Sequence, residues 1–125
     1  MRPGRYRLPL STLALPDGGS IDLHRAERAW ARTRGLLGRP PLAQREGLVI
    51  SRCNSVHTFG MRYPIDVVFV DRNDTVAAIV QHLKPYRFAA CWRAACVVEL
   101  QAGEARRLGL DIGQTLKVGA LRAID

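Results

Sequence analysis

The sequence has no apolar run approaching the ~18 residues that a membrane-spanning helix requires. A moderately apolar stretch follows the basic start, at residues 8–15, but Pro9 and Pro16 interrupt it and no small-residue cleavage site follows cleanly. An alternating strand explains this stretch better than a secretory signal does. We therefore expect a cytoplasmic protein without a membrane span.

Cysteine is also scarce, because the chain has only three: Cys53, Cys91 and Cys96. An odd number without a secretion signal favours reduced thiols over a disulfide framework. Cys53, His57 and Met61 recur every four residues as soft metal ligands would, but a glycine and a proline nearby disfavour the helix that would align them. No second Cys/His pair has the usual zinc spacing. We expect no metal site and no cofactor.

Lysine is almost absent, with two residues against seventeen arginines, and the net charge is +8. The excess is concentrated in residues 1–45, which hold nine arginines and three acids. Arg25, Arg28 and Arg32 share one face of a predicted helix and could follow a phosphate backbone as a weak polyanion binder. No helix-turn-helix, zinc finger or paired stacking aromatics accompanies them, so a solvated face is the simpler interpretation. Nucleic acid is not expected as a partner.

The remaining composition is that of an ordinary globular protein, with 125 residues of which 47% are hydrophobic. A chain of this length buries roughly two-thirds of its unfolded surface, so it needs neither a metal nor a disulfide to hold a core. No linker or repeat divides the sequence. We expect one domain over residues 1–125.

Hydrophobic periodicity predicts many short strands and one early helix. Residues 6–10 alternate as a half-buried strand does, and a glycine-rich turn at 17–19 predicts a hairpin over 13–23. Apolar residues at helical spacing predict an amphipathic helix near residues 25–36, which Trp30 and the adjacent leucines should dock onto the sheet.

Alternation predicts further strands at residues 47–51, 64–70, 75–80, 96–100, 115–118 and 121–124, with a helical turn at 104–108. In the strand over 64–70, Ile65, Val67 and Phe69 should face one way and Asp66 the other. The fold class is therefore mainly β, bordering on α+β. We expect a compact antiparallel sandwich or barrel of short strands with one early amphipathic helix.

One connection between two predicted strands has an unusual density of chemically reactive side chains. Residues 57–66 combine a histidine, two aromatic rings, a thioether, a guanidinium and a carboxylate, and a cysteine stands just before them. Loops held by a rigid sheet are where binding groups usually lie. We therefore predict a binding site formed by seven residues: Cys53, His57, Phe59, Met61, Arg62, Tyr63 and Asp66.

Five segments follow one another in an order that resembles the family called domain of unknown function 192: residues 32–39, 47–50, 57–71, 98–103 and 109–113. The family pattern has an aromatic–methionine element before a proline–hydrophobic–aspartate element, which Phe59, Met61, Pro64 and Asp66 match. Leu37 stands where methionine is frequent. The resemblance covers roughly residues 20–120 and implies a mainly β, sandwich-like fold with no established activity. Many relatives carry an export signal, so their localisation does not transfer.

Two acidic residues interrupt apolar strands, where an ionised carboxylate is costly unless it is paired. For Asp66 we favour a structural clasp, with Arg34, Arg62 or backbone N–H groups of the preceding loop as partners, over a carboxylate at the rim of a pocket. Strict alternation turns Glu99 outward, whereas the alternative places it in a cluster with Asp66 and either Arg34 or His57. Arg34 and Glu99 are therefore supporting candidates for the site.

The sequence leaves three functions open. The leading hypothesis is a small binding domain whose cleft, beside the 53–66 loop, accepts a small molecule or a peptide. The second is a small enzyme that uses Cys53, His57 and Asp66, with a thiolate–imidazolium pair as the reactive element. The third is the weak polyanion binder described above. The sequence identifies no ligand, no reaction and no oligomeric state.

Overall fold

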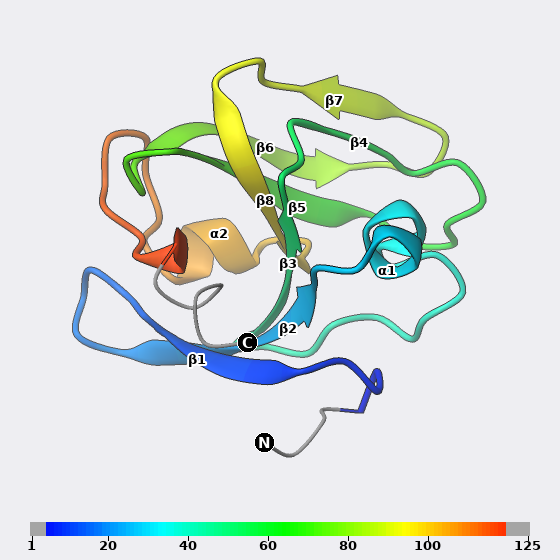
Figure 1. The fold of residues 1–125 in the computed structure, drawn as a ribbon, viewed down its shortest axis with the longest axis horizontal. Coiled ribbons are helices and arrows are strands. Elements are labelled where there is room, and N and C mark those ends of the chain that lie inside the picture. Colours follow the sequence, from blue (N-terminus) through cyan, green and yellow to red (C-terminus); the bar gives the residue numbers. More distant parts are fainter. Residues whose placement is uncertain (1–4, 120–125) are drawn as a thin grey trace.

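The computed structural model describes residues 5–119, in which strands predominate (Figure 1). The elements follow in this order: β1 (Leu10–Ala14), β2 (Ser20–Ala26), α1 (Ala29–Arg34), β3 (Glu46–Ser51), β4 (Ser55–His57), β5 (Ile65–Asp71), β6 (Val76–Leu83), β7 (Phe88–Ala90), β8 (Ala94–Gln101) and α2 (Glu104–Arg107). The mainly β prediction is confirmed. Within the described residues, no helix is long and apolar enough to cross a membrane.

Six strands form one sheet in the order β1-β2-β3-β8-β5-β6, and β4 pairs with β7 in a separate two-stranded sheet. The pairs are antiparallel with one exception, because β2 and β3 run parallel. A parallel pair needs a crossover between its strands, and α1 with the following loop supplies it. In this pair the sheet departs from the purely antiparallel arrangement that the sequence predicted.

Both faces of the large sheet are buried along its central strands β3, β8 and β5, whereas the edge strands β1 and β6 are partly exposed. On one face, Ile50, Val67 and Phe69 pack with residues of α1, β4 and the loops beside them. On the other face, Val49 and Val68 pack with residues of α2 and the segment after it. Figure 1 shows α1 and α2 on opposite sides of β3 and β8. The alternation predicted for β5 is therefore confirmed, and a strand in the middle of this sheet has no solvent-facing side.

The early helix is shorter than predicted and begins at Ala29. Arg25 belongs to β2, where it is opposite Val49 in the parallel pair, so sheet pairing overrides the helical spacing of this segment. Trp30 does not dock the helix, since its side chain is 58% exposed, whereas Leu36 is buried as expected. The helix ends at Gly35, whose combination of φ 54° with ψ −125° is readily adopted only by glycine.

The strand predicted at residues 115–118 is wrong. Thr115 makes one isolated bridge to Thr75, and the chain then turns so that Leu116 and Val118 pack under the sheet. Beside this bridge, the Leu116 N–H donates to the Asp74 carbonyl oxygen at 2.7 Å, which holds the segment against the turn before β6. The edge predicted at 121–124 lies outside the described residues. At the other end, residues 6–8 are not a strand, although Tyr6 and Leu8 are buried.

Candidate functional site

A small hollow lies between the end of α1 and the β4–β5 loop, over the middle of the large sheet. It has a volume of about 60 Å³, which is room for a few water molecules. Four of the predicted site residues and a carboxyl on β8, a supporting candidate, form part of its lining. The lining side chains that matter most are Cys53, His57, Phe59, Met61 and Glu99.

Glu99 comes from β8, the strand that lies between β3 and β5 in the centre of the sheet. Its register partners are Leu48 and Val67, both completely buried. The Glu99 side chain is 4% exposed, and its Oε1 has no hydrogen-bond partner in the described part of the chain. Burial raises the pKa of this carboxyl to about 7. Glu99 is therefore a buried acid that changes its protonation state near neutral pH.

Gly35 forms part of the hollow with its backbone alone. A Cβ at this position would lie 3.6 Å from Glu99 Oε1 and 3.6 Å from Ile50 Cδ1. The positive φ of Gly35 places the chain this close to the carboxyl without a side chain between them. The space above Glu99 therefore exists because the helix ends in a glycine.

Cys53 and His57 both line the hollow, but they do not form a nucleophile–base pair. The Cys53 thiol donates to the Ser55 carbonyl oxygen at 3.0 Å, and burial is the main cause that raises its pKa. His57 is exposed at the mouth, where its Nδ1 accepts from the Phe59 N–H at 3.3 Å and its ring stacks on the Phe59 ring. The arrangement keeps the thiol protonated rather than activated.

A wider groove of about 720 Å³ adjoins the hollow and shares Leu36, Leu37 and Met61 with it. The groove runs between residues 36–41 and residues 60–63, so it takes in Arg62 and Tyr63 from the predicted site. Met61 is buried, whereas Leu37 is exposed at 39%. The two spaces together form a trough of mixed lining, in which Leu36, Leu37 and Met61 are shared apolar residues and Glu99 lies beneath the narrow end.

Arg32 and Arg34 also border the hollow, and carbonyl groups occupy donors of both guanidinium groups. Arg32 Nε donates to Ser51 O and its Nη2 to Arg52 O, both at 2.7 Å. Arg34 Nε donates to Leu37 O at 2.9 Å. With Arg25 buried in β2, the three arginines predicted to share a helix face do not form one exposed phosphate-binding row.

Asp66 lies apart from the hollow, although it was predicted to belong to the same site. It is completely buried and faces the other side of the sheet. Its Oδ1 accepts from His82 N–H at 2.9 Å, and its Oδ2 accepts from the N–H groups of Gly103 and Ala105 at 3.0 and 2.9 Å. Asp66 is a clasp, as favoured, but it holds β6 and the start of α2 rather than the loop before β5.

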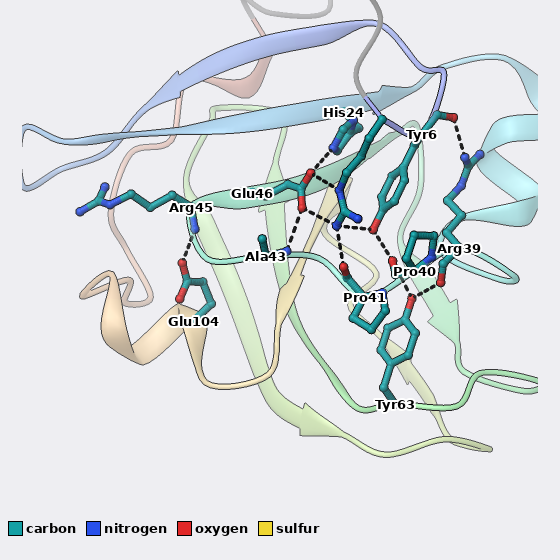
Figure 2. Close-up of polar contacts among 11 residues, drawn as sticks. Tyr6, His24, Arg39, Pro40, Pro41, Ala43, Arg45, Glu46, Tyr63 and Glu104 are labelled. Carbon is teal, nitrogen blue, oxygen red and sulfur yellow. Dashed lines mark hydrogen bonds and ion pairs between the residues drawn. The ribbon is translucent and has the colours of Figure 1, made fainter.

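Glu46, at the start of β3, is the best-connected acid in the described residues (Figure 2). Arg5 donates to both of its oxygens at 2.7 and 2.9 Å, His24 Nε2 lies 2.7 Å from Oε2, and Ala43 N–H donates to Oε1 at 2.8 Å. The Arg5 hydrogen bonds are the main cause that lowers the pKa of Glu46 to about 2. This carboxylate is satisfied on every side.

Two tyrosines and an arginine extend this network (Figure 2), and Arg39 and Tyr63 among them line the groove. The Tyr6 hydroxyl donates to Pro40 O, and the Tyr63 hydroxyl donates to Arg39 O at 2.9 Å. Arg39 in turn donates to Gly35 O at 2.9 Å and to Tyr6 O at 2.8 Å. Tyr63 is therefore a structural support of the groove as well as part of its lining.

Sequence reasoning missed the central position of Glu99 and the part of Gly35. The strand 96–100 is an almost continuous apolar run, and such a run is typical of a strand buried on both faces. That signal favours an inward carboxyl over an outward one. Among residues 5–119 no three His, Cys, Asp or Glu side chains gather as a metal site would require.

Comparisons with known proteins place the chain within a fold but not a function. The model of the family DUF192, described as uncharacterized ACR, matches residues 13–118. No curated protein matches the chain. A protein of unknown function from Novosphingobium aromaticivorans DSM 12444 is 23% identical, with a TM-score of 0.79 over 94% of this chain and 93% of its own. A candidate transcription regulator from Sinorhizobium meliloti 1021 is 23% identical, with a TM-score of 0.75 over 85% and 89%. These likenesses show the fold alone.

Proposed function

The chain belongs to the DUF192 family, and because that family is described without an activity, we propose a function from the site itself. The protein binds a small molecule or the end of a peptide in the trough between α1 and the β4–β5 loop. Glu99 is the group that recognises the ligand, through a hydrogen bond to a donor on it.

The observation that supports this proposal is the unpartnered Oε1 of Glu99 beneath an open hollow. A buried polar group without a hydrogen bond costs roughly 1–3 kcal/mol, and natural proteins rarely keep one without a purpose. Glu99 Oε1 lacks a partner, while the hollow beside it has room for a donor group. A ligand N–H or O–H placed there would satisfy the oxygen and recover that cost.

The shape of the trough favours a ligand with a small polar end and an apolar body. The polar end would enter the hollow of about 60 Å³, and the body would lie along the groove of about 720 Å³ against Leu37, Met61 and Tyr63. Ligand sites are commonly of this kind, mostly apolar with a few placed polar groups. An extended peptide terminus or a small amphipathic molecule fits the description.

A fragment screen tests the proposal directly. Isotope-labelled protein would be titrated with small amides, amines, alcohols and carboxylic acids, and backbone amide shifts would locate binding. Fragments with an N–H or O–H donor should move the amides of Gly35 and Met61. In Glu99→Leu the dissociation constant should rise at least tenfold, since one hydrogen bond to a buried carboxyl is lost.

Asp22→Asn is the matched control, because Asp22 is an exposed carboxylate on β2, away from the trough. Its fragment affinities should equal those of the unaltered protein. Fragments that bind outside the trough, or that bind Glu99→Leu as well as the original, would exclude Glu99 as the recognition group.

Acid–base catalysis by Glu99 is a second candidate, and the raised pKa of its carboxyl is the observation that favours it. A carboxyl with a pKa of about 7 can donate or accept a proton at neutral pH. The Cys53–His57 pair receives no such support, because the thiol pKa is raised and the thiol bonds to Ser55. Slow conversion of a bound fragment, abolished in Glu99→Gln, would favour this candidate over binding alone.

A further inference from the structure

A second surface feature lies on the small sheet formed by β4 and β7. The two chain segments that build it, residues 52–63 and 84–95, contain five basic residues and no acidic residue. They also contain five of the eight aromatic residues of the chain. We call these two segments the arm. Its composition differs from the rest of the chain, where all the acids lie.

The arm has one face toward the core and one toward solvent. Val56 and Ala89 are register partners and pack against the core, so the neighbouring partners His57 and Phe88 point outward. The Thr58 hydroxyl joins the two segments of the arm, because it is buried and donates to Lys84 O at 2.5 Å. Val56 packs in the core cluster and attaches the arm to the rest of the protein, so the outward face is a fixed surface.

Aromatic rings cover this outward face. His57 stacks on Phe59 with ring centroids 5.4 Å apart, and Phe59 lies 6.3 Å from Tyr86. Phe59, Tyr86 and Phe88 are 50%, 63% and 65% exposed. Exposed aromatic rings beside arginines are characteristic of protein interaction sites, where tyrosine, phenylalanine and arginine are enriched.

We propose that the arm docks an extended acidic segment of a partner protein. The two segments carry five cations and no acid, which favours a negatively charged partner and would speed its association. The rings of His57, Phe59, Tyr86 and Phe88 receive apolar side chains that alternate with the acids. β7 lies at the outer margin of the molecule in Figure 1.

The strand edges favour a peptide over an oligonucleotide. The small sheet has only two strands, so β4 and β7 each keep one edge without a strand partner among residues 5–119. An extended peptide can add to such an edge through its backbone N–H and C=O groups, which nucleic acids lack. The rings also pack on one another, so fewer ring faces are open to stack on bases.

A peptide selection tests the proposal. A display library of random twelve-residue peptides would be selected on the full chain, with the capture support alone used for counter-selection. Selected peptides should be enriched in Asp and Glu alternating with apolar residues. Synthetic copies, measured by fluorescence anisotropy, should bind Phe88→Ala and Arg87→Glu at least tenfold more weakly, and binding should weaken as salt rises.

Two variants serve as controls. Trp30→Ala removes an exposed ring on α1, away from the arm, and should leave the peptide affinity within twofold. Glu99→Gln should also leave it unchanged, which separates this surface from the trough. His57 and Phe59 border both the hollow and the arm, whereas Phe88 lines neither the hollow nor the groove and Glu99 is not part of the arm. The variants Phe88→Ala and Glu99→Gln therefore separate loss of peptide binding from loss of fragment binding.

Three outcomes would overturn the proposal. The first is a selection that yields no peptide, or peptides without acidic enrichment. The second is a set of acidic peptides that bind Phe88→Ala as tightly as the unaltered chain. The third is tighter binding of a twenty-residue oligothymidylate, or of vesicles containing phosphatidylserine, with the same dependence on Phe88. That result would assign the arm to nucleic acid or to membrane instead.

Discussion

Glu46 and Glu99 lie on neighbouring strands of one sheet, yet their surroundings give them opposite chemistry. Glu46 receives hydrogen bonds from Arg5, His24 and Ala43, and its pKa falls to about 2. Glu99 Oε1 has no partner in the described residues, and burial raises the pKa of its carboxyl to about 7. The same side chain is thus a structural tie in one region and a buried acid with an unpartnered oxygen in the other.

The largest effect should come from the acid whose partners are all backbone groups. Asp66→Ala leaves three N–H groups, of His82, Gly103 and Ala105, without their acceptor. We expect the free energy of unfolding to fall by about 4 kcal/mol in urea titrations at pH 7. Asp66→Asn keeps one carbonyl oxygen and should lose about half as much. A loss below ~1 kcal/mol in Asp66→Ala would show that these three hydrogen bonds contribute little to stability, and it would contradict the structural role assigned to Asp66.

Glu46→Ala tests the acid of the pair whose carboxylate oxygens both have hydrogen-bond partners. The substitution leaves His24 and Ala43 without their hydrogen-bond acceptor, and we expect the free energy of unfolding to fall by about 3 kcal/mol at pH 7. The loss is smaller than that of a fully buried ion pair because Arg5 is partly exposed. The folded pKa lies below the ordinary value of 4.5, so Glu46 stabilises above that pH and the contribution disappears as pH falls toward 2. The variant and the unaltered chain should therefore converge in acid. Parallel stability curves down to pH 2 would contradict this account.

Glu99→Gln should show the opposite pH dependence. The pKa of Glu99 is higher in the folded chain than its ordinary value of 4.5. The fold is therefore most stable below pH 4.5, where the carboxyl is protonated in both states, and it loses this stability as the pH rises through about 7. We expect the variant to be more stable by about 2 kcal/mol at pH 8 and nearly equal to the unaltered chain at pH 4. Urea titrations at both pH values measure this. A variant that is less stable at pH 8 would mean that the Glu99 carboxylate has a partner after all.

The smallest effect concerns the thiol beside Glu99. Burial raises the pKa of Cys53, and the nearby Glu99 adds to the shift, so little thiolate forms at pH 7. We expect Cys53 to react with iodoacetamide several-fold more slowly than free cysteine, as followed by mass spectrometry of the labelled peptide. Rapid alkylation of Cys53 at pH 7 would reopen the enzyme hypothesis built on Cys53 and His57.

Local patterns predicted the strands well where the sheet follows local alternation. The faces of β5 were correct because Ile65, Val67 and Phe69 obey a period of two. The start of the early helix was wrong because Arg25 is held by a parallel partner, Val49, that no local pattern reveals.

For the site too, the sequence indicated which nearby residues lie together but not which distant residues join them. The loop residues lie together because they are close in sequence, so Cys53, His57, Phe59 and Met61 line one hollow. Glu99 joins them from a strand about forty residues later in the chain. Asp66 departs from them because its alternation takes it through to the opposite face. Long-range pairing decides the position of Glu99, and no local pattern reveals that pairing. The departure of Asp66 follows from local alternation, which the sequence does show.

Gly35 limits how the trough can change during evolution. Its φ of 54° with ψ of −125° is strained for any other residue, so a larger side chain there costs roughly 1–3 kcal/mol and also fills the space above Glu99. Under the proposed binding function, divergence in ligand preference is therefore expected at Leu37 and Met61, on the trough's side-chain wall, where substitutions can alter size without distorting the backbone. Relatives that differ at these two positions would then prefer ligands of different size.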